Sequence, residues 1–388
     1  MKNICVVTGS RAEYGLLKPL LLEINMQKDW HLQLVVTGMH LSSEFGLTYT
    51  EIEKDGFFIS KKVEMLLSSD TEVGIIKSMG IGLIGFADTF KELRPDLIVI
   101  LGDRFEMLAV VEAALIHKVP VAHLHGGEIT EGAYDDSIRH AITKMSHIHF
   151  VSTEPYRHRV IQMGENSKYV FNVGSIGLDN IRNLKLFSKK ELQKKLKVEF
   201  KKYNYLVTYH PATLNEKNNA EEFEQLLLAI DKQKESLFIF TKANADNGGR
   251  KINQMIDDFV FNHSENCIAF TSMGSHLYLS VLQFVDAVVG NSSSGILEAP
   301  ALKVATINIG ERQKGRIQAA SIVNCEAKKN AIENAFNFIK RPQFKSNLVG
   351  MLNPYGDGKT STRIIHYLKN VTWHKLVKKS FYNIDIKV

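Results

Sequence analysis

The stretch Asp96-Leu97-Ile98-Val99-Ile100-Leu101 is followed by Gly102-Asp103-Arg104-Phe105-Glu106 and then by a helix-like pattern over residues 106–116. A continuous apolar run of this length is typical of a strand buried on both faces, as in a parallel sheet. A strand followed by a helix is the repeating unit of α/β folds. This stretch therefore predicts a parallel sheet whose strands end in polar loops.

The same alternation recurs along the whole chain. Strands are expected at residues 4–7, 32–36, 120–124, 149–151 and 170–173, and then at 205–208, 237–241, 268–270, 287–289 and 305–307. A charged stretch at residues 185–202 interrupts the pattern, and 388 residues suit two domains of about 150–200 residues each. We therefore expect an α/β protein with two doubly wound, Rossmann-like domains and a boundary near residues 175–185. In such folds, ligands bind beyond the carboxyl ends of the strands, so two facing domains would form a cleft.

The composition excludes several classes of function. The net charge of +6 arises from 48 basic and 42 acidic residues, and much of the excess lies in Lys-rich helix faces such as residues 188–202. Phe200 is the only aromatic residue in this stretch, too few for a stacking platform, so a nucleic-acid partner is not expected. Cys5, Cys267 and Cys325 form no CxxC pair, which favours a reducing compartment. We recognise no signal peptide and no apolar run of 18 residues, so we expect a cytoplasmic protein without a membrane partner.

The segment Thr8-Gly9-Ser10-Arg11-Ala12-Glu13-Tyr14-Gly15 follows the first strand. Gly9 permits a tight turn, and the helix behind it offers N–H groups to an anion. A plain strand–helix turn is the alternative. Because the segment is not GxGxxG, a nicotinamide cofactor is not indicated.

Two further strand ends in the first half carry titratable residues. Asp103 either caps the following helix or acts as an acid–base group. The loop His123-Leu124-His125-Gly126-Gly127-Glu128 and the later Asp135-Asp136-Ser137-Ile138-Arg139-His140 combine imidazoles, carboxylates and a guanidinium. Clustered carboxylates favour general acid–base chemistry. A metal site and a purely structural role are the alternatives.

The second half has two such strand ends. His210 follows a strand and precedes a proline, which suits either a catalytic or a surface histidine. Gly290-Asn291-Ser292-Ser293-Ser294-Gly295 leads into a helix that carries Glu298, and small hydroxylated residues at a helix start suit phosphate binding. No Walker lysine is present, so a P-loop is excluded, and an N-capped helix is the alternative. The cations of residues 308–316, Arg312 among them, either approach the same strand end or are solvated.

Taken in order, these blocks resemble the UDP-N-acetylglucosamine 2-epimerase family, and most of all its hydrolysing bacterial branch of the sialic-acid pathway. The resemblance covers nearly the whole chain and rests on TGSRAEYG, VTGMHLS, LGDRFEM, HLHGGE, DDSIRHAITKMSH, YHP, GNSSSG and NIGERQKGR. Many relatives have Glu where this chain has His125, while one sub-branch carries His there with the GGE glutamate behind it. The division of acid–base duties between His125 and Glu128 is therefore open.

The resemblance implies a GT-B-like arrangement of two domains. The N-terminal domain with the catalytic loops would span residues 1–178, the UDP-binding domain residues 179–360, and a tail of residues 361–388 would pack back on the first domain. It further implies two sets of site residues. Catalysis would involve Asp103, His125, Glu128, Asp135, Arg139 and His210, and the UDP part of the substrate would contact Arg11, Ser292, Ser293, Gly295, Glu298 and Arg312.

The implied reaction converts UDP-N-acetylglucosamine and water to N-acetylmannosamine and UDP through a glycal, without a cofactor or an obligatory metal, for nonulosonic (sialic) acid synthesis. A homodimer or homotetramer is also implied. The main rival substrate is UDP-2,4-diacetamido-2,4,6-trideoxy-glucose, which would serve legionaminic-type acids. Other rivals are a non-hydrolysing epimerase, a glycosyltransferase of similar fold and a catalytically silent UDP-sugar sensor. The GGE and DDSIRH blocks argue against the first of these three, and the retained titratable residues argue against the sensor.

Overall fold

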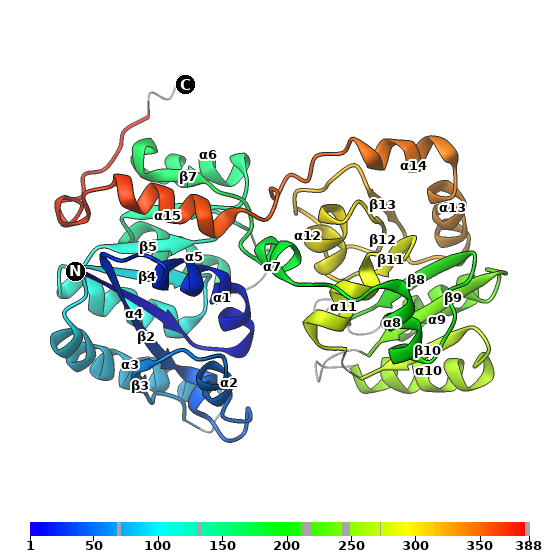
Figure 1. Cartoon of the computed structure of the whole chain (residues 1–388), viewed down its shortest axis with the longest axis horizontal. Coiled ribbons are helices and arrows are strands. Elements are labelled where there is room, and N and C mark those ends of the chain that lie inside the picture. The colour runs from blue at the N-terminus through cyan, green and yellow to red at the C-terminus, as the bar shows by residue number, and fades with distance from the viewer. Residues whose placement is uncertain (68–70, 130–133, 212–218, 243–248, 272, 385–388) are drawn as a thin grey trace. The chain divides into compact units, whose positions relative to one another are not determined.

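Contacts within the chain divide it into two compact units. The computed structural model describes residues 1–67, 71–129, 134–211, 219–242, 249–271 and 273–384. Unit 1 comprises Met1–Asn180 and Tyr355–Val388, and unit 2 comprises Ile181–Pro354. Each unit is built around one parallel sheet with helices between successive strands (Figure 1). The α/β class with two doubly wound sheets, predicted from the sequence, is confirmed.

The sheet of unit 1 has the order β3-β2-β1-β4-β5-β6-β7 within the described residues. Its strands are β1 (Lys2–Thr8), β2 (Trp30–Thr37), β3 (Ile59–Val63), β4 (Leu97–Leu101), β5 (Val121–Leu124), β6 (Ile148–Val151) and β7 (Val170–Asn172). Its helical segments are α1 (Arg11–Asn25), η1 (Gly38–Leu41), α2 (Tyr49–Lys54), α3 (Glu72–Leu93), α4 (Phe105–Ile116), α5 (Tyr134–Met145), α6 (Glu154–Gln162), η2 (Ser167–Tyr169), α15 (Thr360–Asn370) and η3 (Trp373–Lys375).

The sheet of unit 2 has the order β10-β9-β8-β11-β12-β13 within the described residues. Its strands are β8 (Tyr203–Thr208), β9 (Ser236–Thr241), β10 (Cys267–Phe270), β11 (Ala287–Gly290), β12 (Ala305–Ile309) and β13 (Ile322–Cys325). Its helices are α8 (Lys189–Leu196), α9 (Asn219–Ile230), α10 (Gly249–Asn262), α11 (Gly274–Leu282), α12 (Ser294–Ala301), α13 (Lys329–Ile339) and α14 (Pro342–Val349), and α7 (Gly177–Asn183) crosses the boundary between the units.

Apolar side chains cover both faces of each sheet. In unit 1, Ile4 and Val6 of β1 face one cluster and Cys5 and Val7 face another, and all four side chains are fully buried. Unit 2 repeats this arrangement on the two faces of its own sheet. The alternation explains why the central strands are uninterrupted apolar runs in the sequence.

The last helix, α15, belongs to unit 1 although unit 2 precedes it in the chain. Its Ile364 and Leu368 are buried in the same cluster as α1 and β1. The carboxylate of Asp179 accepts hydrogen bonds from the backbone N–H groups of Thr360 (2.8 Å) and Ser361 (2.6 Å), at the start of the helix. This carboxylate satisfies N–H groups that a helix N-terminus leaves without intrahelical partners.

One helix of unit 1 bears on the expectation that no segment spans a membrane. Helix α3 is 22 residues long, and an 18-residue window within it has a mean hydropathy of 1.4, so by length and composition it would suffice to cross a membrane. A single helix of this kind is weak support for a membrane span, because core helices satisfy the same criterion. Phe86 and Phe90 of α3 are indeed buried against the sheet of unit 1.

Candidate functional site

The candidate residues of unit 1 gather where the strand order reverses. Strands β1 and β4 are neighbours in the sheet although two strands lie between them in the sequence. Arg11 follows β1, Asp103 follows β4, and His125 follows β5. Since parallel strands end at the same edge, these loops share one edge of the sheet, which is where open α/β sheets bind ligands.

Asp103 forms an ion pair with Arg139 of α5. Arg139 is 5% exposed, and its guanidinium also donates to Asp136 (3.2 Å) and to the backbone carbonyl of Glu128 (2.9 Å). Burial raises the pKa of the Asp103 carboxyl, Arg139 opposes that shift, and the nearby Asp135 and Glu128 add to it. Asp103 is not a helix cap, because Arg104 occupies the N-cap position of α4.

His125 and Glu128 contact each other across the HGGE loop. Nδ1 of His125 lies 3.2 Å from Oε1 of Glu128, and Ser152 Oγ donates to the same oxygen over 2.9 Å. Nε2 of His125 accepts the backbone N–H of Ile176 (3.4 Å), which in a neutral ring leaves the proton on Nδ1, facing Glu128. Burial disfavours the charge on Glu128, but His125 and Ser152 outweigh it and lower the Glu128 pKa to about 2.

The two glycines of this loop are required by close packing. Gly127 has φ +79°, and a Cβ there would lie 2.6 Å from the carbonyl oxygen of Tyr156 in α6. His125 itself has φ +65°, which is uncommon for a residue other than glycine. His123 differs from His125, because it is buried and bonded to the carbonyl of Gly102 (2.7 Å), and burial lowers its pKa to about 3.

Asp135 and its neighbours lie in the first turn of α5. Asp135 is half-buried and close enough to Asp103 to raise the pKa of that carboxyl. Asp136 pairs with Arg139 and with His140, whose Nε2 lies 3.5 Å from Oδ2. The structure therefore brings Asp103, Glu128, Asp135 and Arg139 together, as a cluster of carboxylates around one buried guanidinium.

The start of α1 differs from the expectation of N–H groups open to an anion. Ser10 and Glu13 form a capping box, in which Oε2 of Glu13 accepts the N–H groups of Gly9 (2.7 Å) and Ser10 (3.0 Å). The side chain of Glu13 thus occupies N–H donors that an anion would otherwise use, which agrees with the alternative of a plain strand–helix turn. Arg11 is exposed and pairs with Glu51 at 2.9 Å.

A second group of charges beneath this turn was not anticipated from the sequence. Glu106 is fully buried and accepts two hydrogen bonds from Arg104, of 2.7 and 3.1 Å. Glu13 is buried nearby, and burial together with the charge of Glu106 raises the pKa of Glu13 to about 7, although backbone hydrogen bonds oppose this. An acid in the first turn of a helix is common, so the GDRFE block gave no signal that Glu106 would be buried.

In unit 2 the switch point lies between β8 and β11. His210 follows β8, and its backbone N–H and C=O both bond to the side chain of Asn291, each at 2.8 Å. The carbonyl of Asn291 accepts from Arg312 (3.1 Å) and Gln313 (2.8 Å). Asn291 therefore fixes the positions of His210 and Arg312, although only its neighbours were selected from the sequence.

In the serine-rich turn after β11, Gly295 packs against β12, whereas Ser292 and Ser293 remain partly exposed. Gly295 is buried, a Cβ there would lie 2.6 Å from Cγ2 of Thr306, and its carbonyl accepts the Thr306 hydroxyl (2.7 Å). Gly295 thus lets α12 approach β12. Ser292 and Ser293 are half-buried, and Ser292 Oγ accepts the N–H of Ser294 (3.3 Å).

Three buried polar atoms gather around α12: Tyr278 Oη, Ser294 Oγ and Glu298 Oε2. None of them has a hydrogen bond of good geometry within the described residues, although Ser294 lies close enough to Tyr278 and Glu298 to oppose the rise of their pKa values. Burial raises the pKa of Glu298. Buried polar atoms usually have partners, so this group has the capacity to bind a polar ligand. Tyr278 lies in an apolar helix, α11, and carried no recognisable signal in the sequence.

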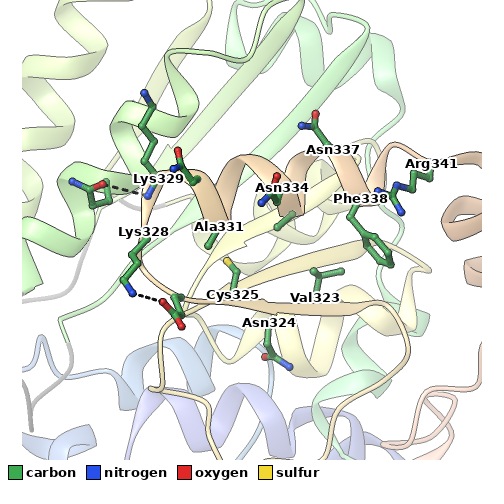
Figure 2. Close-up of a pocket in the computed structure, with 14 residues that line it drawn as sticks. Val323, Asn324, Cys325, Lys328, Lys329, Ala331, Asn334, Asn337, Phe338 and Arg341 are labelled. Atoms are coloured by element: carbon green, nitrogen blue, oxygen red, sulfur yellow. Dashed lines mark hydrogen bonds and ion pairs between the residues drawn. The ribbon is translucent and has the colours of Figure 1, made fainter.

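A cavity of about 1060 Å³ lies elsewhere in unit 2, between β13 and α13 (Figure 2). Asn324, Cys325, Asn334 and Arg341 are among the residues that line it, and the residues selected from the sequence are not. In the part of the chain that the structure describes, no group of three or more His, Cys, Asp or Glu side chains is arranged to hold a metal ion.

Comparisons with known proteins agree with this architecture. The sequence profile of the family described as UDP-N-acetylglucosamine 2-epimerase matches residues 22–369. A Campylobacter jejuni protein named GDP/UDP-N,N'-diacetylbacillosamine 2-epimerase (hydrolyzing) is 46% identical over 99% of both chains. The Escherichia coli polysialic acid biosynthesis protein P7 is 40% identical over 99% of this chain and 98% of its own. The crystal structure of UDP-GlcNAc 2-epimerase from Neisseria meningitidis bound to UDP-GlcNAc has a TM-score of 0.77 at 18% identity, over 96% of this chain and 100% of that one.

Two parallel α/β sheets, each with polar loops at its switch point, define the class of two-unit Rossmann-like proteins to which the Neisseria structure also belongs. Within that class, this chain belongs to the UDP-N-acetylglucosamine 2-epimerase family, whose profile covers most of its length.

Proposed function

We propose that this protein is a hydrolysing 2-epimerase, which releases UDP from a UDP-linked 2-acetamido sugar and inverts C2 of the sugar. Membership of the family supports epimerisation. The 46% identical relative is named as a hydrolysing enzyme, which supports release of the nucleotide.

The proposed reaction has two balanced steps. In the first, a base removes the proton from C2, the C2–H electrons form a C1=C2 double bond, and the C1–O bond breaks so that UDP leaves with its electron pair. In the second, water adds its hydroxyl to C1 of this glycal, and C2 receives a proton from the opposite face. The two steps require at least two proton-transfer groups and a positive environment for the departing diphosphate.

The observation that carries this proposal is the environment of Asp103. Its pKa is raised, which suits proton transfer, and Arg139 holds it at the edge of the sheet beside Asp135. Glu128 has a pKa of about 2, so it stays ionised and suits the stabilisation of positive charge on His125. We therefore assign proton transfer to Asp103 and Asp135, with Arg139 as the positioning residue, and the His125–Glu128 pair as a second donor.

We assign UDP binding to unit 2, with Arg11 of unit 1 as a further cation for the diphosphate. The buried oxygen of Glu298 suits the ribose hydroxyls, which are hydrogen-bond donors. Ser292, Ser293 and Arg312 supply donors for phosphate oxygens, while Gly295 acts through packing. His210, immobilised by Asn291, is placed to protonate or steady the leaving phosphate.

The relatives favour the diacetamido sugar over the first expectation from the sequence. The 46% identical relative is named for N,N'-diacetylbacillosamine, which is 2,4-diacetamido-2,4,6-trideoxy-glucose, linked to GDP or UDP. UDP-N-acetylglucosamine is the second candidate, because the 40% identical relative is named for polysialic acid biosynthesis. Either product would enter nonulosonic acid synthesis for a surface polysaccharide, and we propose that the enzyme acts in the cytoplasm.

The test uses NMR of reactions in deuterated water with three substrates: UDP-N-acetylglucosamine and the UDP- and GDP-linked diacetamido sugars. We expect a free sugar with inverted C2 that carries deuterium at C2. Bound but unaltered substrate would support a sensor, and a nucleotide-linked product would support a non-hydrolysing epimerase.

The assignment of Asp103 is tested with Asp103→Asn. Turnover should fall roughly 10²–10⁴-fold with UDP affinity retained, because general acid–base catalysis contributes about that much. Asp96→Asn is the matched control. Asp96 accepts the N–H of Asn3 (2.7 Å) just before the start of β4, so its loss should affect stability and not turnover. Unchanged turnover in Asp103→Asn would remove that residue from the mechanism.

A further inference from the structure

The C-terminal segment, residues 379–382, follows η3 and lies against unit 1 (Figure 1). The ammonium group of Lys379 donates to the backbone carbonyls of Lys144 and Ser146, each over 2.6 Å, and to Oε2 of Glu165, also over 2.6 Å. These three bonds use all three N–H donors of a lysine side chain. Lys379 is therefore fixed in place, although it lies beyond the last helical segment of the described chain.

Two further contacts hold the C-terminal segment beside Glu165. The ring of Phe381 packs so closely on Gly164 that a Cβ added to the glycine would collide with ring carbons. The backbone N–H of Tyr382 donates to the carbonyl of Gly164 (2.9 Å). Gly164 immediately precedes Glu165, so these contacts and the ammonium group of Lys379 meet at one loop. The segment is thus attached by several contacts and not by a single ion pair.

The carboxylate at this attachment is almost completely buried. Glu165 is 2% exposed, and besides Lys379 it accepts from Lys144 (2.6 Å) and lies 3.0 Å from Nε2 of His149. Burial disfavours its charge, but these partners outweigh burial and lower the pKa of Glu165 to about 2. Removing one partner of a buried charge is costly, because the remaining charge is then incompletely paired. Glu165 therefore gives Lys379 a firm point of attachment.

The other carbonyls that Lys379 binds belong to the end of α5, the helix that carries part of the candidate site. Lys144 lies in the last turn of α5, where helix carbonyls lack intrahelical partners and a cation also offsets the helix dipole. Asp135 lies in the first turn and Arg139 in the middle of the same helix. Only three residues of α5 are buried, so its packing leaves much of its position to the contacts at its ends.

We propose that Lys379 is a positioning residue, which fixes the end of α5 and thereby the places of Asp135 and Arg139 relative to Asp103. This inference rests on the proposed function, because it concerns the groups to which proton transfer is assigned. A helix moves as a rigid element, so a shift at its last turn also displaces the side chains of its first turns. A misplacement of about 1 Å can lower a rate about 10²-fold.

The first experiment measures amide hydrogen exchange of the full chain by mass spectrometry. In Lys379→Met, the amides of α5 should exchange roughly tenfold faster or more than in the wild type, because a helix that has lost charged hydrogen bonds opens more often. Phe381→Ala should act in the same direction, since it removes the ring from Gly164. Lys378→Met changes the exposed neighbouring lysine and is the matched control, with unchanged exchange in α5.

The second experiment separates positioning from stability. With the sugar that the wild type converts, Lys379→Met should lower kcat roughly ten- to hundredfold and keep the affinity for UDP, which is assigned to unit 2. Arg139 opposes the rise of the Asp103 pKa that burial, Asp135 and Glu128 cause. If Arg139 is displaced, Asp103 ionises only at higher pH, so the acidic limb of the kcat/KM profile should move to higher pH. Loss of stability alone would not move this limb.

Each outcome decides one part of the proposal. Unchanged exchange of α5 in Lys379→Met would show that Lys379 does not hold this helix. Faster exchange with unchanged kcat and an unchanged pH profile would overturn the positioning role. A wild type that converts none of the three candidate substrates would refute the proposed function and not the attachment of α5, which the exchange measurement decides independently.

Discussion

The side-chain amide of Asn291 forms two hydrogen bonds with the backbone of His210, one to its N–H and one to its C=O, both 2.8 Å long. The pair joins the ends of β11 and β8, the strands between which the order of the second sheet reverses. A single side chain thereby holds the backbone that carries the imidazole proposed to act on the leaving phosphate.

Asn291→Ala tests this link. The substitution removes the side-chain hydrogen bonds to the N–H and C=O of His210. We therefore expect the free energy of unfolding to fall by about 1–3 kcal/mol and turnover to fall as well. Asn308→Ala is the matched control, because Asn308 is a buried asparagine of β12 whose amide bonds to another side chain, that of Asn324 (2.8 Å). It should lower stability in urea titrations and leave kcat unchanged. An equal loss of kcat in both variants would mean that Asn291 acts through stability alone.

Glu128→Gln tests the charge state of the HGGE loop. The folded-state pKa of Glu128, about 2, is below its ordinary value of 4.5, so its ionisation stabilises the fold above pH 4.5 and this contribution disappears as the pH falls toward 2. The free energy of unfolding should therefore be higher for the wild type than for the variant, and this difference should be larger at pH 6 than at pH 3. A difference that does not change with pH would show that His125 and Ser152 do not favour the charged form.

For Glu13→Gln, the pH dependence of the stability difference from the wild type should have the opposite sign to that of Glu128→Gln. Burial raises the pKa of Glu13 to about 7, so the folded state holds this proton more tightly than the unfolded chain, and stability is lost as the pH rises from 4.5 to 7. Glutamine preserves the capping box without the charge. The variant should gain stability relative to the wild type between pH 5 and pH 8, by up to about 3 kcal/mol.

The control for this prediction is Glu191→Gln in α8, which has the same capping box with Ser188 on an exposed helix. Hydrogen bonds from Ser188 lower the pKa of Glu191, so no gain at higher pH is expected. Thermal unfolding of both variants at the two pH values gives the comparison. A similar pH dependence in both would refute the role of burial at Glu13.

Glu298→Ala tests the UDP site of unit 2. The loss of a charged hydrogen-bond acceptor should weaken UDP binding roughly ten- to hundredfold in isothermal titration. Glu311→Ala removes an 81% exposed carboxylate from the loop after β12 and should leave the affinity unchanged. Full affinity of Glu298→Ala for UDP would contradict the ribose assignment.

Within the described residues, the sequence predicted the central strands and the edge strands β7 and β10, and it missed the edge strands β3 and β13. Strands such as β4 and β11 are buried on both faces and appear as apolar runs. The missed strands β3 and β13 carry polar residues within the sequences ISKKV and IVNC, so they do not appear as apolar runs. Helix α3 was missed for a related reason, since its exposed face is apolar and the usual amphipathic pattern is blurred.

The residues of the candidate site were also predictable only in part. Polar residues directly after buried strands, such as Asp103 and His210, were selected because strand ends are the expected binding edge. Glu106 and Tyr278 were not, because their place beside the site depends on how a helix packs and not on a local pattern. The capping role of Glu13 was visible in the spacing Ser10-x-x-Glu13, yet the same turn also suited an anion.

The carboxylate of Asp179 that holds the first turn of α15 has a consequence for biosynthesis. Because α15 completes the core of unit 1, the sheet formed by the first part of the chain stays without one of its covering helices until residues 360–370 have been translated and have left the ribosome. Unit 2, a single continuous segment, has all of its strands much earlier. Truncation near the C-terminus should therefore impair the unit that was translated first.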